Sequence, residues 1–125
     1  MKKTVLIIDP SHEFIELVTY VLGEHDYGTT GANSLTEALQ ILSQSQFDLI
    51  LTEALDQTNP FDFDPSFLFQ LQTLIPKTPI AICSIYSSVE CLQAGDYGLV
   101  AILRKPIDLS CLETTIINLL TPSSI

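Results

Sequence analysis

The chain has 125 residues, 46% of them hydrophobic, and its fifteen acidic and five basic side chains give a formal net charge of −10. This length fits one domain with one core, and no apolar run reaches the roughly 20 residues of a transmembrane helix. The negative charge disfavours direct binding to nucleic acid, because like charges would meet. We therefore expect a single domain over 1–125, with its core at about 3–120 and a frayed tail at 121–125.

The amino terminus and the cysteines narrow the class further. The apolar part of the opening MKKTVLIIDP is only Val5 to Ile8, which is too short for a signal peptide. A cytoplasmic protein is the default expectation. The three cysteines lack a CxxC spacing and are expected to be small buried residues, and two histidines make a zinc site improbable.

Short apolar segments alternate along the chain with segments of helical periodicity. In chain order we expect a strand at 4–8, a helix capped by Ser11, a strand at 27–32, a helix at 34–42, a strand at 48–52, a helix starting at Pro65, a strand at 78–84, a short helix at 87–95, a strand at 99–103 and a helix capped by Asp108.

Local signals support these helices. Capping boxes are expected at Ser34–Glu37 and Ser87–Glu90, a cap with a first-turn proline at Asp64–Pro65, and a glycine stop at Gly95. The inward faces of the first, third and last helices are expected to hold Phe14, Leu17, Val18, Val21, Phe67, Leu68, Leu71, Leu74, Leu109, Leu112, Ile116, Leu119 and Leu120.

The alternation indicates an α/β protein with a doubly wound parallel sheet, because at least four strands are apolar enough to be buried on both faces. Functional groups in such sheets gather at the carboxyl ends of the strands. The expected strand ends carry Asp9, Glu53, Ser84 and Lys105. We therefore expect two acids, a hydroxyl and an ammonium group at one edge of the sheet.

These residues, in this order, resemble those of the receiver domains of bacterial two-component response regulators. The resemblance runs from Lys3 to Leu120 and rests on the motifs VLIIDPSHEFIELV, FDLILTE, PIAICS and LRKP. It implies a flavodoxin-like, five-stranded parallel sheet in the order 2-1-3-4-5 with five helices. In a working receiver, two acids at the first strand end and an acceptor aspartate hold Mg²⁺, while a lysine and a hydroxyl bind the phosphoryl oxygens.

The sequence departs from the family pattern where phosphoryl transfer would take place. Glu53 stands at the phospho-acceptor position, and Pro10, which offers no side-chain ligand, stands beside Asp9 at the second acidic position. Ile102 occupies the position of the aromatic switch residue. Asp9 and Glu53 are only weak candidate metal ligands, so we expect no cofactor and no well-bound Mg²⁺.

Other positions of the family pattern are kept. Ser84 and Lys105 match the phosphate-binding residues, and Pro106 is the candidate for a cis-proline. We expect a direct ion pair between Glu53 and Lys105, which partly imitates an aspartyl phosphate with one negative charge instead of roughly 1.5–2. For Ser84, a role in the pocket and a bond to nearby backbone are both open.

The resulting hypothesis is an atypical, or pseudo-, receiver domain that is not an enzyme, is not phosphorylated and acts by protein recognition. The expected partner is a histidine kinase, an output domain or another signalling protein, with no direct contact to nucleic acid or membrane. The contact surface is expected either on a Phe-rich loop, NPFDFDPSFLF at residues 59–69, or on the face formed by the predicted helix 87–95, the strand 99–103 and the last helix. A homodimer through that face is a further expectation.

Two alternatives stay open. The first is a phosphorelay receiver that still accepts a phosphoryl group. The second is a small-ligand-binding or enzymatic flavodoxin-like module. The turn IDPSHEF after the first strand contains no glycine to approach a nucleotide phosphate, and no Ser/His/Asp or Cys/His set is visible, which disfavours the second alternative.

Overall fold

The computed structural model describes residues 2–121 and contains all five expected strands. The sheet is parallel and has the strand order β2-β1-β3-β4-β5, so the expected order is confirmed. The chain crosses from one side of β1 to the other, which opens a crevice at the carboxyl ends of β1 and β3. The strands are β1 (Thr4–Ile8), β2 (Gly28–Ala32), β3 (Leu49–Thr52), β4 (Ile80–Ser84) and β5 (Leu99–Arg104).

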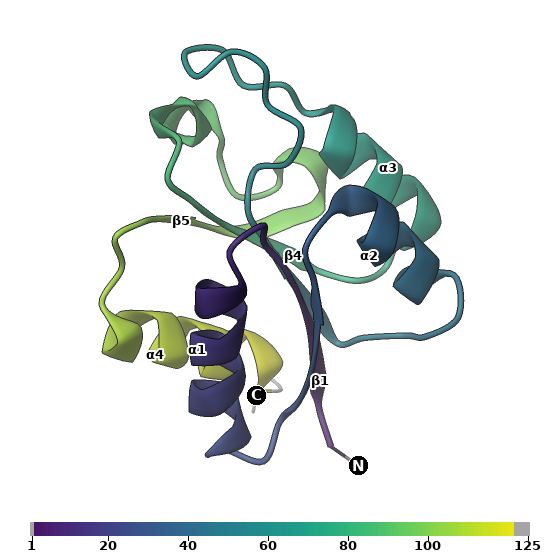
Figure 1. Cartoon of the computed structure of the whole chain (residues 1–125), viewed down its shortest axis with the longest axis vertical. Helices are drawn as coiled ribbons and strands as arrows, with labels where there is room; N and C mark the ends of the chain where they lie inside the picture. The colour runs from purple at the N-terminus through teal and green to yellow at the C-terminus, as the bar shows by residue number, and fades with distance from the viewer. Residues whose placement is uncertain (1, 122–125) are drawn as a thin grey trace.

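Helices cover both faces of the sheet (Figure 1). The helices α1 (His12–Gly23) and α4 (Leu109–Leu120) lie on one face, and α2 (Leu35–Leu42) and α3 (Ser66–Leu74) lie on the other. Successive side chains of a strand point to opposite faces. In β1, Val5 and Ile7 therefore belong to the cluster under α1 and α4, while Leu6 and Ile8 belong to the cluster under α2 and α3.

The expected caps form at three of the four α-helices. Ser11 accepts a hydrogen bond from the amide of Phe14, Ser34 accepts one from Glu37, and Asp108 accepts one from Ser110. Before α3, the carboxylate of Asp64 accepts bonds from the amide and hydroxyl of Ser66, and the helix begins one residue later than expected.

The prediction of a helix at 87–95 is wrong. This segment contains two short 3₁₀ turns, η1 (Ser87–Cys91) and η2 (Asp96–Gly98), so the described residues form four α-helices where five were expected. The Ser87–Glu90 capping box does not form, because the Glu90 carboxylate pairs with Arg104 of β5 at 2.7 Å. Arg104 also donates to the carbonyl oxygens of Ser84 and Ile85, so tertiary contacts override the local helix signal here.

Burial also differs from the expectation at the β5 side of the sheet. Only Leu99 of β5 is buried, because β5 is the last strand of the sheet and lacks a second neighbour. Three strands, β1, β3 and β4, are buried almost throughout, which is fewer than the four expected. On the helices, Leu17, Leu74 and Leu109 are exposed, contrary to their expected inward positions.

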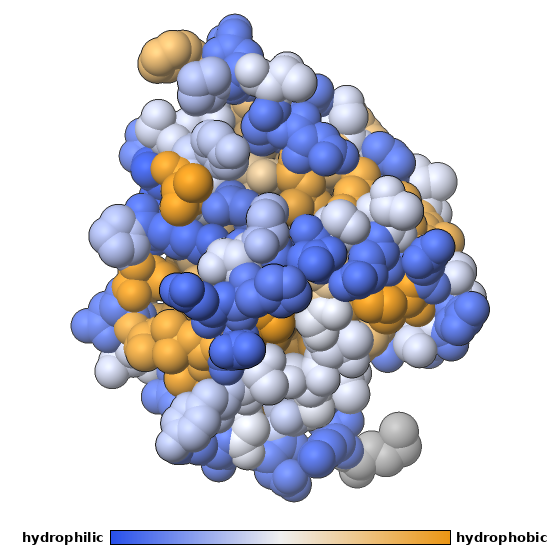
Figure 2. All heavy atoms as spheres, viewed as in Figure 1, coloured by the Kyte–Doolittle hydropathy of each residue, from blue (hydrophilic) through white to orange (hydrophobic). Residues whose placement is uncertain are grey.

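The remaining expectations concern the cysteines, the membrane and the tail. Cys83 is buried, but Cys91 and Cys111 are exposed, so two of the three cysteines are not core residues. Within residues 2–121, each helix is too short or too polar to span a lipid bilayer. The face in Figure 2 is mostly hydrophilic, with separate apolar patches. All of the expected tail except Thr121 lies outside the described residues.

Candidate functional site

Asp9 and Glu53 meet at the crevice because each follows a central strand and continues its hydrogen-bond ladder. The amide of Asp9 donates to the carbonyl oxygen of Ala32, and the amide of Glu53 donates to that of Ile8, both at 2.9 Å. The two residues are 2% and 5% exposed. Two buried carboxylates at one edge require a compensating cation or strong donors.

Lys105 supplies that cation from the end of β5. Its amide donates to the carbonyl oxygen of Ser84 at 2.8 Å, which fixes its backbone beside β4. Its Nζ lies 2.5 Å from Oδ2 of Asp9 and 3.2 Å from Oε2 of Glu53. The ion pair expected between Glu53 and Lys105 is present, and the shorter contact to Asp9 was not anticipated. The peptide bond between Lys105 and Pro106 is cis.

Backbone amides also donate hydrogen bonds to both carboxylates. Oδ1 of Asp9 accepts from the amide of Ser11 at 2.9 Å. Oε1 of Glu53 accepts from the amide of Ala54 at 2.6 Å, and Oε2 accepts from the amide of Ile85 at 3.1 Å. Glu53 therefore ties the end of β3 to the end of β4, and all four carboxylate oxygens of the pair have protein donors.

The electrostatics of the site follow from burial and from the excess of one negative charge. Burial lowers the pKa of Lys105, but its hydrogen bond to Asp9 and the charges of Asp9 and Glu53 outweigh that effect, so the pKa is raised overall. Below these groups, burial raises the pKa of the Cys83 thiol to about 11, with Lys105 opposing and the two carboxylates adding to the shift. Lys105 stays protonated and Cys83 stays neutral at physiological pH.

This donor set does not fit a magnesium ion. Mg²⁺ binds oxygen ligands in a near-octahedral arrangement, commonly one or two carboxylates with water and phosphate oxygens. Here Pro10 provides no ligand, and the oxygens of Asp9 and Glu53 already accept bonds from Lys105 and from amides. Residues 2–121 contain no group of three or more metal-ligating side chains. The ammonium group of Lys105 lies where a shared cation would balance the two acids.

A pocket of about 410 Å³ opens above these charged groups. Ile85, which is 62% exposed, stands at its margin. Its lining residues are Asp9, Pro10, Ser11, Phe14, Glu53, Ala54, Ile85, Tyr86 and Lys105.

Two residues from the sequence prediction lie apart from this pocket. Ser84 is completely buried, and its Oγ accepts a hydrogen bond from the amide of Tyr86 at 2.9 Å, which corresponds to the backbone alternative. Ile102 is half-buried and packs against the cluster beneath α2 and α3. Neither of them contacts Glu53 through a hydrogen bond.

Sequence reasoning missed two contributors to the site. Phe14 was assigned only to the core face of α1, yet Nζ of Lys105 lies 4.1 Å from the centroid of its ring, a cation–π contact. Arg104 had no assigned role, although it fixes η1 next to the pocket. One feature of the sequence could have indicated both residues: Phe14 lies five residues after Asp9, and Arg104 directly precedes Lys105.

Comparison with known proteins decides the family. The response regulator receiver domain family matches residues 5–117. The chain belongs to this family. The receiver domain is 31% identical over 113 residues to the response regulator protein PilR of Pseudomonas aeruginosa and 28% identical over 114 residues to the transcriptional regulatory protein ZraR of Escherichia coli K12. Each alignment covers 90% of this chain and 25% of the relative, so the chain spans about a quarter of their length.

Solved structures show the same receiver fold. A response regulator from Thermotoga maritima superposes with a TM-score of 0.82 at 19% identity, covering 98% of this chain and 100% of that one. The chemotaxis response regulator CheY4 of Vibrio cholerae superposes with a TM-score of 0.78 at 23% identity, covering 95% and 99%. These similarities support the flavodoxin-like α/β architecture.

Proposed function

We propose that this receiver domain signals by protein recognition and does not run a phosphoryl cycle. The observation that carries the proposal is the bonding of Glu53, whose two oxygens accept hydrogen bonds from Ala54, Ile85 and Lys105. An acceptor carboxylate must present a free oxygen to the incoming phosphorus. Glu53 would have to give up bonds at a buried position before it could do so.

Charge supports the same conclusion. A phosphoryl group brings further negative charge to a transition state that metal ions or cationic side chains must stabilise. The site has two carboxylates and one ammonium group, and the Lys105 ammonium is already shared between Asp9 and Glu53. Pro10 replaces the acid that would help to hold a metal. A phosphoryl donor would therefore meet an unbalanced negative charge.

Glu53 instead acts as a permanent negative charge at the acceptor position. It links the ends of β3 and β4 through the amide of Ile85, and it reaches Lys105 across the sheet edge. It carries a single charge, whereas a phosphoryl group carries roughly 1.5–2. The proposed result is a receiver held in one arrangement, with its site kept in shape and its signalling state independent of a kinase reaction.

The proposed partner is a protein: a histidine kinase, an output domain or another signalling protein. The relatives named above are a response regulator and a transcriptional regulator about four times as long as the aligned segment, which supports an association with further domains. Of the two surfaces considered from the sequence, the one around 87–95 lacks its helix and has a half-exposed β5 in its place. The loop between β3 and α3 is the better-defined candidate, and a homodimer remains a hypothesis for the β5 side.

A phosphorylation assay tests the proposal. The purified chain is incubated with Mg²⁺ and acetyl phosphate, and its intact mass is measured. We expect no acid-labile phosphoryl adduct. Glu53→Asp alone should also stay unmodified, because Pro10 still withholds a metal ligand, whereas Pro10→Asp combined with Glu53→Asp should gain an adduct.

The variants also separate the competing explanations. An adduct on the wild-type chain would mean that it is a phosphorelay receiver after all. An adduct on the Glu53→Asp single variant would show that the account of Pro10 is wrong. A receiver of known phosphorylation activity, treated in parallel, verifies that the donor and the metal are active in the assay.

A further inference from the structure

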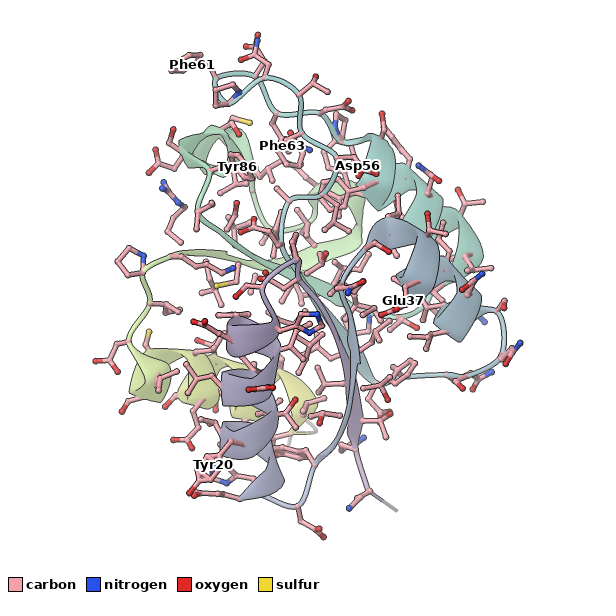
Figure 3. All side chains as sticks on the ribbon, in the orientation of Figure 1. Tyr20, Glu37, Asp56, Phe61, Phe63 and Tyr86 are labelled. Carbon is pink, nitrogen blue, oxygen red and sulfur yellow. The ribbon has the colours of Figure 1, made fainter. Side chains whose placement is uncertain are left out.

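The loop between β3 and α3 carries two phenylalanines with opposite environments. Phe63 is half-buried and packs edge-to-face on Phe67 of α3, with ring centroids 5.9 Å apart. Phe61, two residues earlier, is 85% exposed and extends from the outermost part of the loop, away from the body of the domain (Figure 3). It is the most exposed of the large hydrophobic side chains in the described residues.

The base of this loop is closed by one side chain. The side-chain amide of Gln57 donates to the carbonyl oxygen of Asp64 at 2.7 Å and accepts from the amide of Asp64 at 2.8 Å. Gln57 also donates to the carbonyl oxygen of Leu55 at 3.0 Å. The side-chain amide thus pairs with the backbone of Asp64 as a neighbouring strand would, and it fixes the two ends of the loop together.

The tip of the loop has bonds of its own. The amide of Phe61 donates to Oδ1 of Asn59 at 2.8 Å, which forms an Asx turn around Pro60. Nδ2 of Asn59 donates to Oδ2 of Asp62 at 3.1 Å. The backbone that carries Phe61 is therefore fixed by hydrogen bonds within the loop. A loop ordered before binding loses less conformational entropy when a partner covers it.

The loop that carries Phe61 is acidic. Asp56, Asp62 and Asp64 are all exposed, and the segment from Glu53 to Pro76 contains no lysine or arginine. Hydrogen bonds from the side chain and backbone of Ser66 lower the pKa of Asp64, so that carboxylate stays ionised. An apolar side chain on an acidic loop complements an apolar pocket bordered by positive charge.

We propose that Phe61 is the anchor by which this receiver domain docks on a partner protein, and that the docking surface of the partner is an apolar pocket rimmed by lysine or arginine. Aromatic side chains that fill a pocket at the centre of an interface commonly carry much of the binding energy. A second copy of this chain would bring its own acidic loop and a formal charge of −10, and an anionic membrane would repel the same loop. The inference rests on the proposed recognition function and names its contact residue.

Site-specific cross-linking tests the proposal. The photoreactive amino acid p-benzoylphenylalanine replaces Phe61 in the full chain, expressed in the cells that naturally produce it. The matched control carries the same replacement at Tyr20, an aromatic residue of α1 that is 66% exposed and lies at the opposite end of the domain (Figure 3). We expect a protein to be cross-linked at position 61 and absent at position 20.

The cross-linked protein is then purified, and its affinity for the unmodified chain is measured by calorimetry. Phe61→Ala should weaken binding by about 30-fold, whereas Tyr20→Ala should leave it unchanged. Asp62→Asn should reduce the association rate and its dependence on salt. The proposal is wrong if position 61 captures no more than position 20, if it captures a second copy of the chain, or if Phe61→Ala binds as tightly as the wild type. A phosphoryl adduct in the mass assay would overturn the proposed function without changing these affinities.

Discussion

Hydrogen bonds have opposite effects at the charged edge of the sheet and at the tip of the β3–α3 loop. At the edge, Asp9, Glu53 and Lys105 bond to one another and to backbone amides, so their reactive atoms are already engaged. At the tip, the bonds of Asn59 hold the backbone and leave the ring of Phe61 without cover. The first arrangement leaves no carboxylate oxygen without a donor, whereas the second leaves an aromatic ring accessible to a partner.

On the proposed function, this contrast lets a receiver domain keep its architecture while another surface carries its signalling role. The ion-paired edge is expected to contribute to the stability of the fold, because a buried charge that loses its partner is destabilising. The exposed ring is compatible with the fold because its loop makes its own hydrogen bonds. The edge is therefore expected to govern stability, and the loop tip is expected to govern binding.

The largest effect should come from Lys105→Met, which removes the shared cation and keeps much of the side-chain volume. Asp9 and Glu53 would then be two buried carboxylates with backbone amides as their only strong donors. We expect the free energy of unfolding, measured in urea at neutral pH, to fall by about 3 kcal/mol.

Lys77→Met is the matched control for this experiment. Lys77 is exposed and has no ion-pair partner within residues 2–121. Its replacement should change the free energy of unfolding by less than about 0.5 kcal/mol. Equal losses in the two variants would show that the edge does not depend on its cation.

The second largest effect is a loss of stability at alkaline pH, caused by the buried thiol of Cys83 near the charged edge. Burial raises the pKa of Cys83 from 9.0 to about 11. Because the folded pKa is the higher one, this contribution to stability is complete below pH 9 and is lost as the pH rises to about 11. Lys105, whose folded pKa is also raised, adds a loss in the same direction above the ordinary lysine range.

A substitution at Cys83 isolates the contribution of its thiol to this loss of stability. Cys83→Ala should lose about 2 kcal/mol less unfolding free energy than the wild type between pH 9 and pH 11. Chemical denaturation at a series of pH values measures this difference. Cys111→Ala, which removes an exposed thiol from α4, should keep the wild-type slope. Parallel curves for the wild type and Cys83→Ala would contradict the prediction.

The strands and the residues at their ends were predictable from the sequence pattern, and the strand order followed from the resemblance to receiver domains. The bonding partners at the site were not predictable. Continuous apolar runs marked the buried strands, and parallel pairing then placed Asp9, Glu53 and Lys105 at one edge. The amides of Ala54 and Ile85, which complete the site, have no side-chain signature. No residue pattern shows which carboxylate oxygen a backbone donor will reach.

In two regions, tertiary contacts determine a structure that the local sequence pattern does not predict. The Ser87–Glu90 capping box predicted a helix, but Arg104, fourteen residues after Glu90, attracts that carboxylate and leaves a 3₁₀ turn. Phe61 and Phe63 look alike in sequence, and only the fold decides that one packs on Phe67 while the other faces water.

The smallest effect on stability, and the sharpest test of the contrast, is Gln57→Ala. The variant deletes the side chain that closes the loop by pairing with both backbone groups of Asp64, but it leaves Phe61 in place. Since these bonds are partly exposed, the free energy of unfolding should fall by no more than about 1 kcal/mol. Amide hydrogen exchange at 58–64 should become much faster, while exchange in β1 and β3 stays as in the wild type. Gln40→Ala, which truncates an exposed glutamine in α2, is the control and should leave the loop unchanged.

Binding of the Gln57→Ala variant to the partner captured at position 61 should weaken although the aromatic ring is still present, because the anchor must then be ordered during docking. Unchanged affinity together with fast exchange would mean that the order of the loop contributes nothing to recognition.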